Sequence, residues 1–172
     1  MGWRARRSRH WHFGGRQVGQ FKRSVTVRCP IDKAFDYVND WQNIKSFMSN
    51  IIEINPISLV QYGPGAAFDT TFKLGGANIP TTLEVFEFIR DTKLILKSRQ
   101  GLKLTGGWEF KSAPEGTVLS FSLQYELPPT MSRNEKDKQK IDKELDDSAV
   151  QSLQLLKWVL ESRTLQNANQ KD

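Results

Sequence analysis

The chain has 172 residues, of which 38% are hydrophobic, and it carries a formal net charge of +6. This length suits one domain with a sizeable core, and the single cysteine, Cys29, excludes an intrachain disulfide. No stretch approaches the roughly 18–20 apolar residues of a membrane helix. Because a lone cysteine also suits a reducing compartment, we expect a cytoplasmic protein.

The positive charge is concentrated in residues 1–17. Five of the chain's 25 basic residues lie there without any acid, which leaves 20 basic against 19 acidic residues elsewhere. We expect this basic tail to be disordered. Four interpretations stay open: an extension that is not native, a polybasic arm for RNA or an anionic membrane, an organelle-targeting peptide, and a metal site at His10 and His12, which lacks further ligands.

A strand and two short helices are predicted first. Alternating apolar residues predict a strand over residues 19–28. Pro30 stops this strand and suits the first turn of a helix, and Asp40 can cap a second one. The apolar residues at helical spacing are Ile31, Ala34, Phe35 and Val38 in the first helix, and Trp41, Ile44, Phe47 and Met48 in the second.

Six more strands follow, because apolar residues recur at every second position from residue 50 to residue 127. Short turns rich in glycine, such as the one at 63–65, separate them and imply an antiparallel meander. The predicted strands are 51–62, 66–74, 79–91, 93–100, 103–112 and 117–127.

One of these strands, 79–91, has two possible orientations. If Leu83, Val85 and Ile89 face inward, so does Glu87. If Phe86 and Phe88 face inward, Glu84 does too. An inward carboxylate would be a candidate general base or a ligand contact, although an exposed one is the commoner case.

A long helix ends the fold. Ser132 and Glu135 have the spacing of a capping box, and nothing breaks a helix from there to about Arg163, which gives roughly 45 Å of helix. Its polar start, 133–140, is expected to project beyond the body or to form a mobile rim. One apolar stripe is predicted, with small residues at its middle: Ile141, Leu145, Ser148, Ala149, Ser152, Leu155, Leu156, Val159 and Leu160.

Small residues at the middle of the stripe mean either a close approach to the sheet or a void. Strands 66–74, 103–112 and 117–127 favour a void, since each has one wet face and one dry face, and the dry faces are rich in aromatic residues. An ordinary filled core fits the same pattern. The candidate ligand-binding residues are Phe68, Thr70, Phe72, Trp108, Phe110, Phe121, Tyr125, Ser148, Ser152 and Leu156.

The order strand, two short helices, six strands and long helix resembles the helix-grip fold of the START-like superfamily, especially its polyketide cyclase/dehydrase and lipid-transport branch. The resemblance covers about residues 19–163 and is carried by the segments 25–35, 62–65, 107–110 and 116–119. It implies an α+β domain over 18–165, with a curved antiparallel seven-stranded sheet wrapped around the C-terminal helix, and a disordered 166–172. It also implies a hydrophobic cavity with gates near 75–80 and 101–107.

Three functions are compatible with this fold. The first is binding or transport of a hydrophobic small molecule such as a lipid, a quinone or a polyketide-like compound. The second is an aromatase/cyclase or dehydratase, for which the candidate acids and bases are Glu84, Glu87, Tyr125 and Lys73. The third is an interaction protein that uses the basic tail.

The balance among these functions leans away from an enzyme, because both histidines lie in the tail. Cys29 is expected to be a buried structural thiol, and no metal ligand cluster or cofactor motif is present. The identity of the ligand and the oligomeric state are not readable from the sequence.

Overall fold

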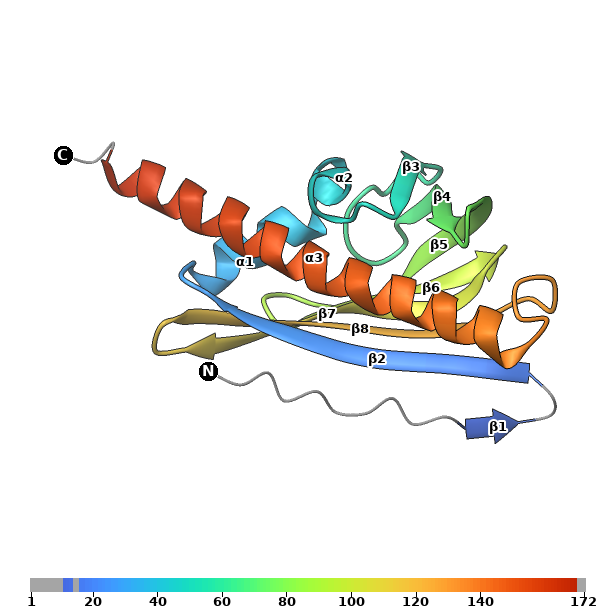
Figure 1. Ribbon diagram of the computed structural model, residues 1–172. Helices are drawn as coiled ribbons and strands as arrows, with labels where there is room; N and C mark the ends of the chain where they lie inside the picture. The colour runs from blue at the N-terminus through green and yellow to red at the C-terminus, as the bar shows by residue number, and fades with distance from the viewer. Residues whose placement is uncertain (1–10, 14–15, 170–172) are drawn as a thin grey trace.

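The computed structural model describes residues 11–13 and 16–169, and it shows an antiparallel sheet that wraps around one long helix (Figure 1). The sheet order is β1-β2-β8-β7-β6-β5-β4-β3. The elements are β1 (Trp11–Phe13), β2 (Arg16–Val27), α1 (Ile31–Asn39), η1 (Trp41–Asn43), α2 (Ile44–Phe47), β3 (Ile51–Pro56), β4 (Ala67–Leu74), β5 (Ala77–Ile89), β6 (Lys93–Gln100), β7 (Lys103–Ala113), β8 (Gly116–Glu126) and α3 (Glu135–Asn169).

This architecture confirms the expected α+β helix-grip fold, with short helices after the first long strand. The seven predicted strands correspond to β2–β8, and the short β1 adds an eighth by pairing with the start of β2. The expected tails, 1–17 and 166–172, lie partly outside the described residues. Within them, the described residues belong to β1, the start of β2 and the end of α3, and the disorder expected for the tails stays a prediction.

The short helices begin as predicted. Pro30 precedes the first residue of α1, and the Asp40 carboxylate accepts a hydrogen bond from the Gln42 N–H at 3.0 Å at the start of η1. Their apolar faces lie against the sheet, where Phe35 and Phe47 are completely buried. These contacts close one end of the space between sheet and helix.

The prediction of a strand over 51–62 was too long, because β3 ends at Pro56. Proline has no N–H to continue a ladder. The Ser58 hydroxyl then takes over backbone bonding, accepting from the Ala67 N–H at 2.8 Å and donating to the Val60 carbonyl at 2.5 Å. The residues that follow β3 form a loop in which Leu59 is fully exposed.

A β-bulge explains why strand 79–91 had two possible orientations. Val85 pairs with Leu96 but Glu87 pairs with Ile95, so one extra residue enters β5 between them. The bulge reverses the alternation of side chains. Leu83 therefore faces inward before it and Phe88 packs inward after it, whereas Phe86 is 64% exposed.

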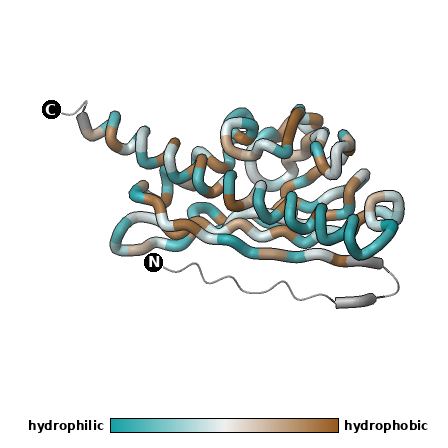
Figure 2. The backbone as a smooth tube through the Cα atoms, viewed as in Figure 1, coloured by the Kyte–Doolittle hydropathy of each residue, from teal (hydrophilic) through white to brown (hydrophobic). Residues whose placement is uncertain are grey.

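The start of α3 differs from the predicted capping box. Asn134 caps the helix, because its Oδ1 accepts from the Asp137 N–H at 2.8 Å, and the Ser132 hydroxyl donates instead to the Pro128 carbonyl. The polar first turns are visible in Figure 2 as the hydrophilic end of the helix. They do not all project into solvent, since Lys138 is 4% exposed.

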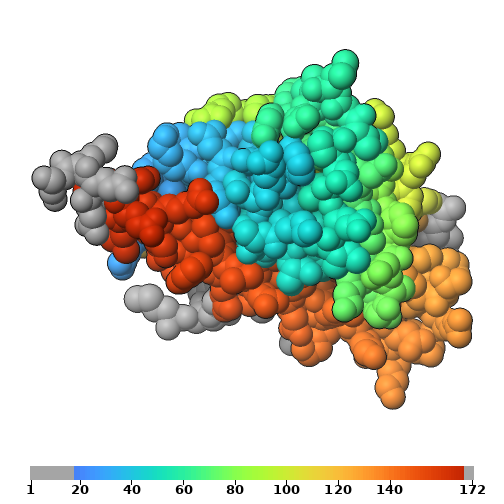
Figure 3. Space-filling model, turned by 90° about the horizontal axis from the view of Figure 1, so that it is seen from above, coloured from blue at the N-terminus to red at the C-terminus, as the bar shows by residue number. Residues whose placement is uncertain are grey.

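The core lies between the inner face of the sheet and α3. Figure 3 shows the segment that contains α2 and β3 packed beside the long helix. The apolar stripe is mostly as predicted, but the sequence reasoning missed Leu153, which is 1% exposed. A helix that is gripped by a curved sheet and by α2 contacts protein over a wider arc than one stripe provides.

Candidate ligand-binding cavity

A cavity of about 70 Å³ lies between α3 and the inner face of the sheet. Small residues border the space on the helix side, whereas on the sheet side Leu123 occupies the place that a side chain at Gly106 would take. Ser148, Ala149 and Ser152 line it from α3, and Gly106 lines it from β7, between the larger Leu104 and Trp108. The small middle of the helical stripe therefore borders a void. This answers the question that the sequence left open between a void and a close approach to the sheet.

The structure divides the ten candidate ligand-binding residues into two groups. Those on the cavity wall are Phe72, Trp108, Phe121, Tyr125, Ser148 and Ser152. Those packed in the surrounding core are Phe68, Thr70, Phe110 and Leu156. In the second group, Phe110 packs on Phe35 of α1 at 5.0 Å between ring centroids, and Phe68 packs on Trp41 of η1 at 6.4 Å.

Tyr125 reaches across β2 to the long helix because its neighbour on that strand is a glycine. Gly19 pairs with Tyr125, and a Cβ atom at Gly19 would lie 2.3 Å from the Tyr125 ring. The Tyr125 hydroxyl donates to the Asp142 carboxylate at 2.5 Å. Burial raises the pKa of the Tyr125 phenol far above its usual range, and the hydrogen bond to Asp142 raises it further. Tyr125 is therefore a neutral donor and not a base.

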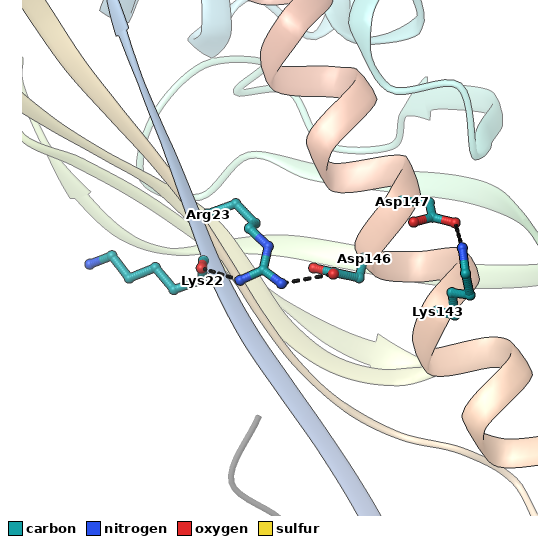
Figure 4. A network of polar contacts seen from close by, with 5 residues as sticks. All are labelled: Lys22, Arg23, Lys143, Asp146 and Asp147. Atoms are coloured by element: carbon teal, nitrogen blue, oxygen red, sulfur yellow. Dashed lines mark hydrogen bonds and ion pairs between the residues drawn. The ribbon is translucent and has the colours of Figure 1, made fainter. Parts of the chain in front are cut away.

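Charged residues continue this contact along the seam between β2 and α3. Arg23, on the inner face of β2, donates to the Asp146 carboxylate at 2.7 Å (Figure 4). The amine of the buried Lys138 lies 3.8 Å from Asp142. The sequence reasoning missed all four of these charged residues. The available signal was Arg23, which stands at an inward position of β2 between Phe21 and Val25.

The carboxylates proposed as bases lie away from the cavity. Glu84 pairs with Arg99, and Glu87 lies 3.5 Å from the amine of Lys93. Neither residue lines the cavity, and Lys73 is exposed on β4. Among the described residues, those on the cavity wall therefore include no candidate base with a charged side chain.

Cys29 is buried as expected, and burial raises the pKa of its thiol. A raised pKa lowers the fraction of the reactive thiolate at neutral pH. The side chain also lies in the core, 3.5 Å from the Pro30 carbonyl. Both features fit the structural role that the sequence predicted.

Of the two segments expected to frame the cavity, 101–107 contributes residues to its wall and 75–80 does not. At Gly75, between β4 and β5, a Cβ atom would lie 3.2 Å from Met131 and 3.5 Å from Ile141, so this turn abuts the start of α3. Leu102, between β6 and β7, is buried and lines the cavity. Its N–H donates to the Thr81 hydroxyl at 3.1 Å, which ties one hairpin to the neighbouring strand.

Within 11–13 and 16–169, no helix is long and apolar enough to cross a membrane. The same part of the chain has no group of three or more His, Cys, Asp or Glu residues that could hold a metal ion. Residues 1–10, which include His10, lie outside this part, so the interpretations that concern the tail stay predictions.

Comparison with known proteins identifies the family. A family model described as polyketide cyclase / dehydrase and lipid transport matches residues 19–154. No match was found among curated proteins. Three solved structures share the fold at low sequence identity, which makes them informative about the fold alone.

The first is the di-domain ARO/CYC StfQ of the steffimycin biosynthetic pathway, which is 20% identical with a TM-score of 0.68. The alignment covers 86% of this chain and 52% of StfQ, so the chain spans about half of that protein. The second is the Zhui aromatase/cyclase from Streptomyces sp. R1128, with 12% identity, a TM-score of 0.68, and coverage of 86% and 96%. The third is Ara h 8.0201, with 14% identity, a TM-score of 0.60, and coverage of 84% and 99%.

The family match spans the strands and most of the helix that enclose the cavity. The fold and the family match therefore identify the same family, and the matched residues include the elements around the cavity. The chain belongs to the polyketide cyclase / dehydrase and lipid transport family.

Proposed function

We propose that this protein binds or carries a hydrophobic small molecule, such as a lipid, a quinone or a polyketide-like compound, between the sheet and α3. One observation carries the proposal: an apolar cavity remains open at the centre of the domain, where dense packing is the rule. Aromatic and aliphatic walls with a few polar groups are typical of ligand pockets.

The volume of the cavity sets a condition on binding. Pockets for drug-sized ligands measure about 300–1,000 Å³, whereas this cavity measures about 70 Å³. A larger ligand must therefore widen the space by moving side chains or α3. The first half of α3 is suited to such movement, because its contacts with β2 and β8 include the polar pairs of Asp142 with Tyr125 and Asp146 with Arg23.

An aromatase/cyclase or dehydratase is the second candidate, because StfQ is a di-domain ARO/CYC and Zhui an aromatase/cyclase of the same fold, and the family description includes dehydrases. Such chemistry needs an acid or base beside the substrate. The cavity wall offers the neutral Tyr125 phenol, and both Glu84 and Glu87 are paired elsewhere. These features favour a carrier over an enzyme.

Native mass spectrometry of the protein purified from its own host tests the proposal. We expect a stoichiometric hydrophobic molecule that is released on denaturation. Ala149→Phe, which places a ring at a wall position that is 3% exposed, should abolish its retention. Ala168→Phe, at an exposed position of the same helix, should not.

Two outcomes would decide between the alternatives. If the protein is empty and gains no thermal stability from a panel of hydrophobic compounds, the proposed binding is refuted. If the released molecule is chemically altered on incubation with the protein, the protein is an enzyme and the proposed carrier function is rejected.

A further inference from the structure

The polar groups of the cavity wall differ in how they are used. Five lining residues carry a side-chain nitrogen or oxygen atom, namely Asn50, Trp108, Tyr125, Ser148 and Ser152. Tyr125 already donates its hydroxyl proton to Asp142. Among the described residues that line the cavity, none has a charged side chain. An ionised ligand group would therefore lose its hydration without gaining a counter-ion, which is unfavourable.

Asn50 and Ser152 have unused hydrogen-bonding capacity. Asn50 Oδ1 and Ser152 Oγ are both buried without a hydrogen-bond partner among the described residues. Ser152 as a whole is 1% exposed. Buried polar atoms in folded proteins are nearly always paired, so two unpaired atoms on the wall of one cavity point to a missing ligand group.

A hydrogen bond between side chains joins the two segments that carry Asn50 and Ser152. Ser49, which precedes Asn50, donates to the Gln151 side chain at 3.3 Å, and Gln151 precedes Ser152. The Asn50 carbonyl accepts from the Lys73 N–H at 2.8 Å, which fixes this segment to β4. The connection between α2 and β3 and the middle of α3 are therefore in contact beside the cavity.

Resting on the proposed function, we propose that the ligand is a neutral apolar molecule with a hydroxyl group that binds between Asn50 and Ser152. The ligand hydroxyl donates its proton to Asn50 Oδ1 and accepts one from the Ser152 hydroxyl. A hydrocarbon satisfies neither atom. A carboxylate places its negative charge against the Asn50 oxygen, in a cavity without a cation on its wall.

Three compounds with one ring skeleton test this inference: 1-naphthol, naphthalene and 1-naphthoate. Because all three must widen the cavity by a similar amount, their affinities differ chiefly through the polar group. Calorimetric titration of the full-length protein at pH 7 should show 1-naphthol binding at least about fivefold more tightly than naphthalene, since one net hydrogen bond corresponds to roughly 2- to 13-fold. 1-Naphthoate should bind most weakly.

Substitutions then assign the effect to these residues. Ser152→Ala should reduce the affinity for 1-naphthol by about threefold to tenfold and leave that for naphthalene within about twofold. Asn50→Leu, which removes the acceptor of the ligand hydroxyl, should likewise weaken the binding of 1-naphthol and leave that of naphthalene nearly unchanged. Ser162→Ala on the same helix, outside the cavity wall, is the matched control and should preserve the preference.

The outcomes separate this inference from the proposed function. If naphthalene binds as tightly as 1-naphthol, or if the preference survives in both variants, the hydroxyl site is refuted while hydrophobic binding stands. Tightest binding of 1-naphthoate refutes the neutral ligand. If none of the three compounds binds and the native protein is empty, both proposals fail together.

Discussion

Replacing Gly19 with alanine should lower the free energy of unfolding, although alanine normally stabilises a strand relative to glycine by roughly 0.5–1 kcal/mol. The added Cβ would lie 2.3 Å from the Tyr125 Cζ and 2.4 Å from its hydroxyl oxygen. The neighbouring backbone of β8 fixes where Tyr125 starts, so the ring must turn away. Its hydrogen bond to Asp142 is then lost.

The expected loss follows from two contributions. Forcing a side chain out of place in a packed interior costs about 1–3 kcal/mol, and a hydrogen bond to a charged group contributes about 1.5–3 kcal/mol. The Asp142 side chain is 23% exposed, so water replaces part of the hydrogen bond. We therefore expect a net loss of about 2–4 kcal/mol in the free energy of unfolding, against a typical total of about 5–15 kcal/mol.

Guanidinium denaturation of Gly19→Ala, Tyr125→Leu and the double variant measures this coupling. In the Tyr125→Leu background, Gly19→Ala should be neutral or slightly stabilising, because the ring is gone. Gln20→Ala, at the adjacent exposed position, should change stability by less than about 0.5 kcal/mol. An equal loss from Gly19→Ala in both backgrounds would refute the role assigned to the ring.

Two pH-dependent effects should accompany this one. Burial and the hydrogen bond to Asp142 raise the pKa of Tyr125. Above pH ~10 the unfolded state therefore loses a proton that the folded state keeps, and stability falls as the pH rises. Above this pH, the melting temperature should fall less steeply with pH for Tyr125→Phe than for Tyr62→Phe, and equal slopes would contradict this. Burial raises the pKa of Glu161, but the hydrogen bonds from Lys157 and from the Arg28 N–H outweigh it and lower the pKa. Glu161→Gln should therefore destabilise at pH 7 and progressively less as the pH falls below the ordinary Glu pKa of about 4.3, because the native carboxylate is then protonated in turn. A stability difference that does not shrink as the pH is lowered would count against this.

The order of elements could be predicted from the sequence because it depends on local periodicity. Alternating apolar residues located six of the strands after the first helices, and a run without breakers located α3. Boundaries were less secure where a single side chain competes with the backbone. Ser58 ended the pairing of β3 earlier than expected, and Asn134 replaced Ser132 as the cap of α3.

The candidate site was only partly predictable. Phe72, Trp108 and Ser152 lie on the cavity wall, whereas Phe68 and Phe110 are on the same dry face but pack against the short helices. Alternation assigns a side chain to a face and gives no position along it. The distance of each residue from the small centre of α3 depends on how the sheet curves around the helix.

By itself, the sequence determined the fold class, the dry face of the sheet and the small-residue centre of the helix, since each follows from spacing along one segment. Only the tertiary structure decided that β5 bulges and turns Glu84 and Glu87 away from the cavity. It alone brought Asn50 beside the helix that carries Ser152. Such contacts join segments far apart in the chain, and their energies depend on packing geometry that no local pattern encodes.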